Sequence, residues 1–309
     1  LNAEQVVWGF VCPQGLFLWE NNELVHFADD PQLLGALSDE LKLSWCGFDL
    51  KNFWQNLNLK NPIAHWDSQL AAYVIKPGDS SEWERVVAHA LGELPADLPS
   101  PEQILTTHLK LEKSLRHKLH IVGGENVYEN LDLPLAAILY KMEKRGIHLD
   151  KTCLYKQNEE ISADLKQLEK DIYEISGETF NIASPKQLAV VLFDKLKLPP
   201  SKKTKTGFST DNDVLEKLRS SHPIIVKILS YRELAKLKST YVEALPNLVK
   251  EDGRIHSHFH QALTTTGRLS STEPNLQNIP IRTERGARVR EAFVAEPGRL
   301  LLSVDYSQI

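Results

Sequence analysis

The end of the chain holds the side chain best placed for chemistry. Asp305 opens the final segment Asp305-Tyr306-Ser307-Gln308-Ile309 and follows Leu300-Leu301-Leu302-Ser303-Val304, an apolar run typical of a buried strand. A carboxylate at the end of a rigid strand can present its oxygens to a divalent metal. An aspartate in that place also serves as a turn residue or a cap. The segment alone therefore leaves a metal ligand and a turn residue both open.

A lysine-rich loop is the second feature that can bind a ligand. Ser201-Lys202-Lys203-Thr204-Lys205-Thr206-Gly207 places three lysines among hydroxyl groups and a glycine. Such a loop can lie along a phosphate backbone, or it can be an ordinary solvated loop. More basic and hydroxyl side chains recur near the end of a predicted helix and favour a surface that grips a duplex without reading its sequence: Arg232, Lys236, Lys238, Ser239 and Thr240.

Three histidines alternate along a predicted strand from Ile255 to Gln261. His256, His258 and His260 are expected to share one face of that strand, which makes a zinc site conceivable. No carboxylate or cysteine lies close to them in the sequence. A zinc site is therefore disfavoured.

The distribution of charge matters more than the net charge of −5. Residues 1–130 carry 9 basic and 18 acidic side chains, residues 131–200 carry 10 and 11, and residues 201–309 carry 17 and 12. An acidic front part would repel a polyanion, whereas the basic last third can hold one, although uneven composition by chance gives the same numbers. A nucleic-acid surface is expected toward the C-terminus.

The composition indicates an ordinary globular protein with two or three domains. No apolar run approaches the roughly 18 residues that span a bilayer, and the N-terminus shows no signal-peptide pattern. The three cysteines, Cys12, Cys46 and Cys153, are too far apart for a zinc spacing or a disulfide framework. We therefore expect a cytoplasmic protein with reduced thiols and no membrane partner.

The elements that must position these residues fall into two groups. Residues 6–27 alternate and turn like two β-hairpins, and helices are predicted over 31–41, 67–75, 82–91 and 102–118, with a strand over 43–48, which together indicate a small α/β domain. Farther on, an apolar stripe from Leu154 to Ile175 predicts a long helix ending at Gly177. Its expected partner is a second long helix over 223–241, so an antiparallel pair is favoured over a coiled coil.

A dense and ordered run of motifs precedes Asp305. Thr264-Thr265-Thr266-Gly267-Arg268-Leu269-Ser270-Ser271 is followed by Glu273-Pro274-Asn275-Leu276-Gln277-Asn278-Ile279-Pro280 and then by the final segment. Here the chain closely resembles the family A DNA polymerases. The resemblance continues backward through residues 231–241, 180–188 and 139–147. It is specific from about residue 130 onward and loose before that.

This resemblance implies a fold class of α/β plus mainly α. A degenerate RNase H-like exonuclease-type domain would occupy residues 1–118, and the polymerase domain would start at 119–150. A helical thumb would span 151–255, and the beginning of an α+β palm would span 256–309. The family extends a primer along a template with deoxynucleoside triphosphates, so primer-template DNA and dNTP are the implied partners and Mg²⁺ is the implied cofactor.

The resemblance also implies roles for single residues. Asp305 would help to hold two catalytic Mg²⁺ ions, with the Tyr306 carbonyl as a further ligand and with Ser307 and Gln308 nearby. Arg268 would reach into the minor groove, where acceptors shared by all base pairs report duplex shape rather than sequence. The other implied DNA contacts are Asn275, Gln277, Asn278 and Arg282 beside template and primer, and Arg232, Lys236, Ser239, Thr240, Lys202, Lys203 and Lys205 in the thumb.

Two departures from the family pattern change the expected activity. Phe53 stands where the exonuclease domain has a metal-binding aspartate, and the first acidic pair and the third motif are not recognisable. Without those carboxylates the metals that generate the attacking hydroxide cannot be held, so no 3′→5′ exonuclease activity is expected.

The second departure is that the family's remaining catalytic elements do not follow Ile309. Two-metal phosphoryl transfer needs more than one carboxylate. We therefore expect the chain alone to bind primed duplex without polymerising. It would be a fragment, a DNA-binding piece without chemistry, or one subunit of a split polymerase completed by a second polypeptide, associated with the nucleoid.

Overall fold

The structure of this chain is a computed structural model that describes residues 5–12, 15–20, 22–26, 31–79, 81–200, 203–204, 207–281 and 283–307. The described chain divides into two units. Unit 1 lies within Leu1–Gly146 and His256–Gln277, and unit 2 lies within Ile147–Ile255 and Asn278–Ile309. The polypeptide thus leaves unit 1 and later returns to it. The predicted boundaries at residues 118, 150 and 255 follow the resemblance and stay predictions.

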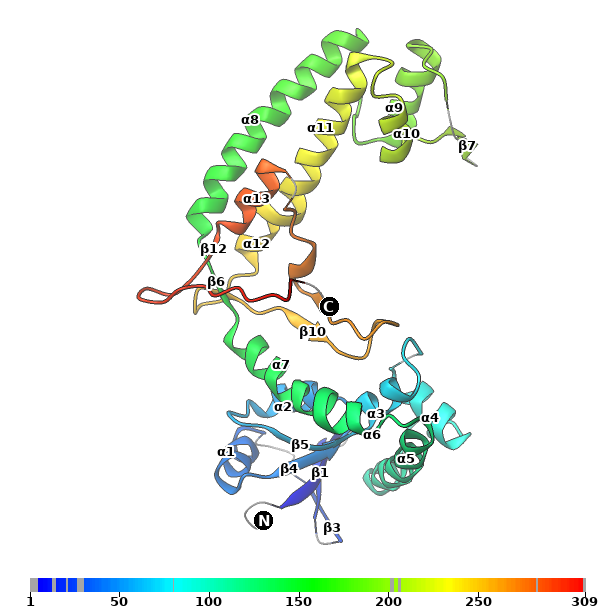
Figure 1. The fold of residues 1–309 in the computed structure, drawn as a ribbon, viewed down its shortest axis with the longest axis vertical. Coiled ribbons are helices and arrows are strands. Elements are labelled where there is room, and N and C mark those ends of the chain that lie inside the picture. The colour runs from blue at the N-terminus through cyan, green and yellow to red at the C-terminus, as the bar shows by residue number, and fades with distance from the viewer. Residues whose placement is uncertain are drawn as a thin grey trace. The chain divides into compact units, whose positions relative to one another are not determined.

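Unit 1 is built on a five-stranded mixed sheet (Figure 1). Its strand order is β3-β2-β1-β4-β5, with β1, β2 and β3 antiparallel and β1, β4 and β5 parallel. This arrangement confirms the two predicted hairpins and the α/β character of the region. The strands are β1 Val6–Cys12, β2 Gly15–Glu20, β3 Glu23–His26, β4 Ser44–Gly47 and β5 Ile63–Asp67.

Helices on the sheet bury a large aromatic core. Trp45, Trp54 and Trp66 are fully buried. The four helices predicted for this region are confirmed, whereas α2 and β5 were not predicted. The helices are α1 Pro31–Leu41, α2 Leu50–Leu57, α3 Ser68–Ile75, α4 Trp83–Leu91, α5 Pro101–Val122, α6 Glu125–Val127, the π-helical turn η1 Tyr128–Asp132, and α7 Leu133–Arg145.

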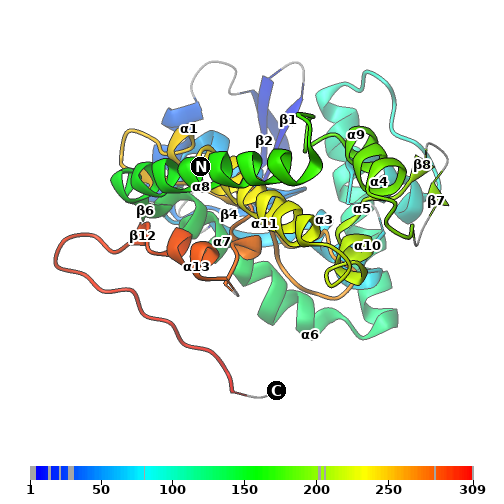
Figure 2. The ribbon, with the colours of Figure 1, turned by 90° about the horizontal axis from the view of Figure 1, so that it is seen from above.

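Unit 2 is organised by the predicted antiparallel pair of long helices. Helix α8, Lys151–Ser176, and helix α11, Pro223–Leu237, lie side by side (Figures 1 and 2). Ile172 of α8 belongs to the same buried cluster as Ile224 and Ile228 of α11. Gly177 ends α8 with a positive φ of 74°, the conformation that glycine adopts at little cost. The apolar stripe therefore predicted this pairing correctly.

Shorter elements complete both units. Unit 1 receives the antiparallel pair β10 and β11, and a three-stranded sheet in unit 2 has the order β12-β6-β9. Their bounds are β6 Ile147–Leu149, α9 Pro185–Ala189, η2 Val190–Lys195, β7 Lys203–Thr204, β8 Gly207–Phe208, α10 Asn212–Lys217, η3 Lys238–Val242, α12 Ala244–Asn247, β9 Arg254–Ile255, β10 His258–His260, β11 Ser270–Thr272, η4 Leu276–Asn278, α13 Glu284–Arg290 and β12 Phe293–Val294.

Two predicted strands are wrong in the structure. Residues 300–304 form no strand, and the apolar side chains of Leu300 and Leu302 are 95% and 88% exposed. A strand needs a hydrogen-bonding neighbour and a covering layer, and the described chain supplies neither to this segment. The strand predicted from Ile255 to Gln261 is broken instead at His256 and Ser257, so that β9 and β10 belong to different sheets.

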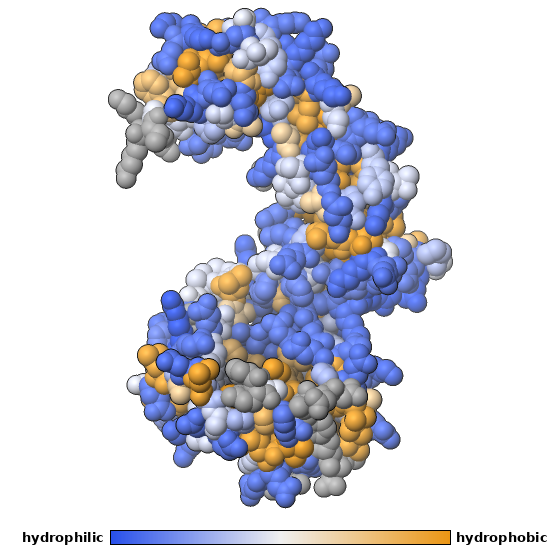
Figure 3. Space-filling view, turned by 180° about the vertical axis from the view of Figure 1, so that it is seen from behind, coloured by the Kyte–Doolittle hydropathy of each residue, from blue (hydrophilic) through white to orange (hydrophobic). Residues whose placement is uncertain are grey.

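The surface is mainly polar. Figure 3 shows hydrophilic residues over most of the visible face, interrupted by smaller apolar groups. Within the described ranges, no helix combines the length and the apolar character that crossing a bilayer requires.

Candidate nucleic-acid interface

A groove of about 660 Å³ in unit 2 brings together several residues that the sequence singled out. Arg232 and Lys236 of α11, Thr240 of η3 and Asn278 all line it. These residues lie up to 46 positions apart in the chain, and the packing of α11 against its neighbours places them on one surface. The sequence did not point to six other polar residues of the lining, two of them acidic: Asn212, Glu216, Arg219, Ser230, Glu233 and Thr283.

The cationic side chains of the groove differ in how far they are committed to other protein groups. Lys236 and Thr240 are exposed. Arg219 holds Glu216 with two hydrogen bonds, of 2.7 Å from Nε and 2.8 Å from Nη2. Side chains that remain at the surface of a groove can contact a phosphate at little desolvation cost.

Arg232 has a structural contact that the sequence did not reveal. Its guanidinium donates to the carbonyl and the hydroxyl of Thr210, which is buried. Burial lowers the pKa of Arg232, but an arginine stays charged at neutral pH. The Arg232 side chain therefore holds the segment before α10 against α11, and Arg232 also lines the groove.

The polar run after Gly267 organises its own loop within unit 1. The Asn275 side-chain oxygen accepts a hydrogen bond of 3.0 Å from the Gln277 amide, and the Gln277 side chain donates one of 2.9 Å to the Leu269 carbonyl. The hydroxyl of fully buried Ser271 accepts the Leu276 amide at 3.1 Å. Arg268 remains exposed beside this loop. Its guanidinium is thus presented on a loop that its neighbours hold in place.

The predicted metal ligands at the C-terminal end are exposed. Asp305, Tyr306 and Ser307 all lie at the surface in a segment without regular structure. Gln308, Arg282, Lys202 and Lys205 lie outside the described residues, and of Lys203 only the backbone in β7 is described. Over the described ranges, no group of three or more His, Cys, Asp or Glu side chains could hold a metal ion.

The three histidines around β10 make separate contacts. His256 Nδ1 lies 2.8 Å from the Glu143 carbonyl, His258 Nδ1 lies 3.8 Å from the Glu143 carboxylate, and His260 Nε2 lies 2.8 Å from the Thr272 hydroxyl. The three histidines do not share one strand, because His256 lies in the break before β10 and only His258 and His260 belong to β10. The carboxylate of Glu143 does lie close to His258, but Glu143 is too far away in the sequence for the sequence to indicate this.

Glu143 of α7 is the centre of a buried polar network in unit 1 that the sequence missed. Its side chain is 3% exposed and accepts Lys51 Nζ at 2.6 Å and the Phe259 amide at 2.7 Å. Gln55 also donates to this carboxylate. A single carboxylate in α7 thereby contacts both helix α2 and strand β10.

Two further carboxylates, Asp49 and Asp67, interact with each other in unit 1. Asp67 is buried and accepts backbone N–H groups, among them Leu50 at 2.8 Å and Gln69 at 2.9 Å. Burial, followed by repulsion from Asp49, raises the pKa of Asp67 to about 7, and burial also raises the pKa of Asp49. Phe53 packs edge-on against Trp45, with the ring centres 5.1 Å apart. Phe53 and Asp49 line the same cavity, so an apolar ring and a single carboxylate share that surface.

Comparison with known proteins defines the class to which this arrangement belongs. The profile described as DNA polymerase family A matches residues 151–309, more than half of the chain. The chain belongs to this family. The matched region contains the groove of unit 2, the Arg268 loop and Asp305.

Individual relatives resemble more of the chain. DNA polymerase I of Bacillus subtilis (strain 168) is 47% identical over 280 residues, which cover 83% of this chain and 31% of the relative. DNA polymerase I of Lactococcus lactis subsp. cremoris (strain MG1363) is 40% identical over 316 residues, which cover 95% of this chain and 36% of the relative. The chain therefore spans about a third of the length of the curated relatives it matches.

A solved structure shares the fold. The POL domain of Pol1 from M. smegmatis, in complex with DNA primer-template and dNTP, superposes with a TM-score of 0.81 at 31% sequence identity. The match covers 95% of this chain and 55% of that one. The similarity thus extends to the N-terminal region, where the sequence motifs gave only a loose resemblance.

Proposed function

We propose that this chain forms the first part of the polymerase unit of a DNA polymerase I-like enzyme and binds primed duplex DNA. The observation that carries the proposal is the groove in unit 2, where Lys236, Thr240 and Asn278 meet within the region matched by the family. In this proposal residues 1–118 are a vestigial exonuclease-like domain and residues 119–150 begin the polymerase domain. Residues 151–255 are the thumb and residues 256–309 are part of the palm.

The chemistry of the exposed residues supports a grip on the DNA backbone. Lys236, Ser239 and Thr240 offer a cation and two hydroxyls, groups that bind phosphate oxygens without reading bases. Arg268 and Gln277 are exposed on the loop of unit 1 and suit minor-groove acceptors, which all base pairs share. The further contacts in this proposal are Asn275, Asn278, Arg282, Arg232, Lys202, Lys203 and Lys205.

DNA synthesis is proposed for the longer enzyme and requires more than these residues. Asp305 and the Tyr306 carbonyl would take part in a Mg²⁺ site that also meets the dNTP. By themselves they do not fit two metals, because the described part of the chain places no set of metal-binding side chains around Asp305. The missing ligands must come from further sequence or a second polypeptide, so the 309-residue chain binds primed duplex without extending it.

Two measurements test this proposal. Fluorescence anisotropy with a primed duplex should show binding by the 309-residue chain that weakens steeply as salt rises, because phosphate contacts release counterions. Primer extension should appear only when a polypeptide carrying the family's remaining catalytic segments is added. No binding at low salt would rule the proposal out. Extension of the primer by the chain alone would contradict the proposal that further catalytic segments are required.

We also propose that the exonuclease-like region has lost 3′→5′ hydrolysis. The support is that Phe53, whose ring packs against Trp45, stands where the family has a metal-binding aspartate, so this position supplies no carboxylate for the metals that generate the attacking hydroxide. The purified chain with Mg²⁺ or Mn²⁺ should release no nucleotides from a labelled 3′ end. Release that disappears in an Asp49→Ala variant would sink this part of the proposal.

A further inference from the structure

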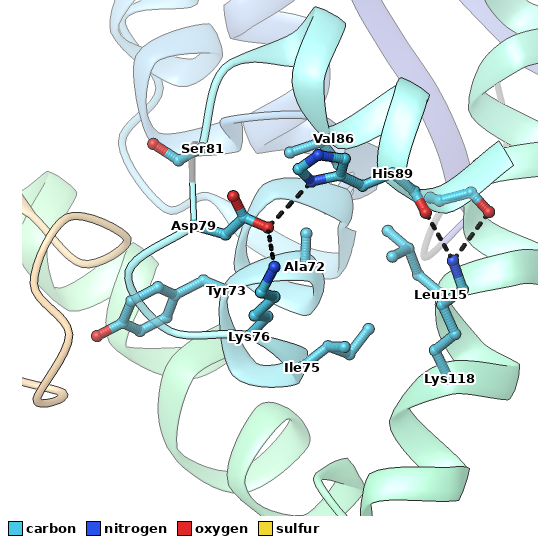
Figure 4. Close-up of a pocket in the computed structure, with 11 residues that line it drawn as sticks. Ala72, Tyr73, Ile75, Lys76, Asp79, Ser81, Val86, His89, Leu115 and Lys118 are labelled. Carbon is cyan, nitrogen blue, oxygen red and sulfur yellow. Dashed lines mark hydrogen bonds and ion pairs between the residues drawn. The ribbon is translucent and has the colours of Figure 1, made fainter. Parts of the chain in front are cut away.

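The last turn of helix α3 contacts the loop that carries Arg268. The hydroxyl of buried Tyr73 donates a hydrogen bond of 2.8 Å to the Thr264 carbonyl, although the two residues lie 191 positions apart. Figure 4 shows the Tyr73 side chain pointing toward the segment drawn in pale orange. Tyr73 lies outside residues 151–309, which the family profile matches, whereas Thr264 lies inside them. The N-terminal part of unit 1 is thus bonded to the Arg268 loop.

Thr264 contacts Tyr73 and Arg268 at the same time. Its carbonyl accepts the Tyr73 hydroxyl, and its own hydroxyl donates to the Arg268 carbonyl at 2.7 Å. Thr264 is half-buried, whereas residues 265–268 are exposed. An exposed segment opens easily unless bonds tie it to the interior. One intervening residue therefore links Tyr73 to Arg268.

The turn after α3 packs directly on the next residue of the loop. Gly78 has a φ of 84°, and a Cβ added to it would lie 2.3 Å from Cγ2 of Thr265. Real Cβ atoms do not approach other heavy atoms that closely. Glycine therefore permits both the positive φ and the close approach of this turn to Thr265.

An aspartate ties this turn to the neighbouring helix α4. Asp79 lies 3.0 Å from both Lys76 Nζ and His89 Nδ1 (Figure 4). The Asp79 amide also donates to the Lys76 carbonyl at 3.3 Å. His89 belongs to α4, so the turn is anchored on its inner side while Gly78 meets Thr265 on the other.

The chain that leads from β10 into the loop is held in the same way. The Phe259 amide donates to the buried Glu143 carboxylate, as described above, and the side chain of Gln261 donates to the Asp132 carbonyl at 2.9 Å. Gln261 is itself buried. Residues from the first 146 positions thus contact this segment repeatedly before it reaches Arg268.

We propose that Tyr73 and Gly78 are positioning residues that hold the Arg268 loop in the conformation that binds duplex DNA. Tyr73 acts through Thr264, and Gly78 acts through Thr265. A loop that is already ordered loses less conformational freedom on binding, so its contacts contribute more to affinity. The inference rests on the proposed function, in which Arg268 contacts the minor groove. It gives the vestigial exonuclease-like domain a role in DNA binding that needs no metal.

Limited cleavage by trypsin measures the loop without DNA, because the bond after Arg268 is a trypsin site. Tyr73→Phe removes the hydroxyl and keeps the ring, so the bond after Arg268 in the folded 309-residue chain should be cut about fivefold faster, the effect of one ordinary hydrogen bond on local opening. Mass spectrometry of the first products identifies the bond that is cut.

Tyr140→Phe is the matched control for this measurement. The Tyr140 hydroxyl also donates to a backbone carbonyl of unit 1, that of Leu59 at 2.7 Å, but it lies outside the Arg268 loop. The control should cut after Arg268 at the parent rate. An unchanged rate in Tyr73→Phe, or an equal rise in Tyr140→Phe, overturns the proposal whether or not the chain binds DNA.

A double-mutant cycle on duplex affinity tests the functional consequence. Arg268→Ala should weaken binding of primed duplex about tenfold. Tyr73→Phe should weaken it about threefold in the parent chain and less than about 1.5-fold in Arg268→Ala, because the lost position matters only while the arginine is present. Tyr140→Phe should leave affinity unchanged in both backgrounds.

The outcomes separate this inference from the proposed function. Equal losses from Tyr73→Phe in the two backgrounds, or no loss in Arg268→Ala, overturn the inference and leave duplex binding in place. No binding by the parent chain refutes the proposed function, and the trypsin comparison then decides whether Tyr73 holds the loop.

Gly78→Ala tests the second contact independently of the tyrosine hydroxyl. The added Cβ displaces Thr265, so faster cleavage after Arg268 and weaker duplex binding are expected, as for Tyr73→Phe. Gly92→Ala is the control, because Gly92 has a similar φ of 77° and nothing in the described chain lies within 4 Å of its added Cβ. Equal effects of the two changes would show that backbone strain is responsible and would overturn the role of Gly78.

Discussion

The two units use polar side chains in opposite ways. In unit 1 the carboxylates of Glu143 and Asp67 are buried and accept hydrogen bonds from several elements. In unit 2 Lys236 and Thr240 stand exposed on the surface of a groove. The first kind of residue stabilises the fold, because removing it strands its partners in a dry interior. The second kind can bind a polyanion and can be lost without unfolding the chain.

The largest expected effect is on catalysis. Asp305→Ala in the longer enzyme should lower primer extension by about ten-thousandfold, the order found when one member of a catalytic set is removed. Duplex affinity and the free energy of unfolding should stay close to those of the parent, since Asp305 is exposed. Single-turnover extension and anisotropy measure the two properties separately. Retained turnover in Asp305→Ala would show that Asp305 is not a ligand of the catalytic metals.

A large effect on stability is expected at Glu143. Glu143→Ala leaves the ammonium of Lys51, whose side chain is 11% exposed, without its partner and should lower the free energy of unfolding by about 3–5 kcal/mol. Urea denaturation of the 309-residue chain measures the change.

The control for this experiment is an exposed ion pair in the same unit. Glu93, 3.4 Å from Lys110, and its partner both have side chains that are 58% exposed. Glu93→Gln should change stability by less than about 1 kcal/mol. Equal effects at the two positions would break the contrast between buried and exposed charges.

A pH dependence of stability follows from Asp67. Because its pKa is about 7 in the folded chain and about 4 in an unfolded one, the folded state binds more protons between these values. The contribution of Asp67 to stability therefore falls as pH rises from about 4 to about 7, by at most about 1.4 kcal/mol per pH unit. Urea denaturation across this range should show a steeper decline for the parent chain than for Asp67→Asn. Identical slopes of stability against pH in the parent and in Asp67→Asn would mean that the Asp67 carboxylate is ionised throughout this range. Asp97→Asn, a change at an exposed position, is the control and should show the same slope as the parent.

The smallest effect is expected at the groove. Lys236→Gln should lower duplex affinity equally for all sequences and reduce the slope of log K against log salt by about 0.9, the share of one phosphate contact. The midpoint of urea unfolding should not move, and Lys60→Gln, an exposed change in unit 1, should leave the slope unchanged. An unchanged slope of log K against log salt in Lys236→Gln would show that Lys236 does not contact a phosphate.

Local sequence patterns predicted much of the fold. The hairpins, the paired helices α8 and α11, and helix ends such as Gly177 depend on neighbouring residues, so period and turn chemistry were enough to find them. Helix α2 was missed although its buried residues Leu50, Phe53, Trp54 and Leu57 follow the i, i+3, i+4, i+7 spacing of an amphipathic helix. The strand expected at residues 300–304 does not form. An apolar run predicts burial, but only a partner strand supplies it.

The sequence by itself determined the family resemblance and the residues that carry it. The motifs around Arg268 and Asp305 are runs of neighbouring residues, so they can be recognised without knowing the fold. Tertiary structure alone decided which polar residues meet. Glu143 lies 92 positions from Lys51 and 116 from Phe259, and no local pattern links them. The same holds for the groove that joins Lys236 to Asn278. Burial and partnership arise from packing, and packing brings together residues that the sequence keeps apart.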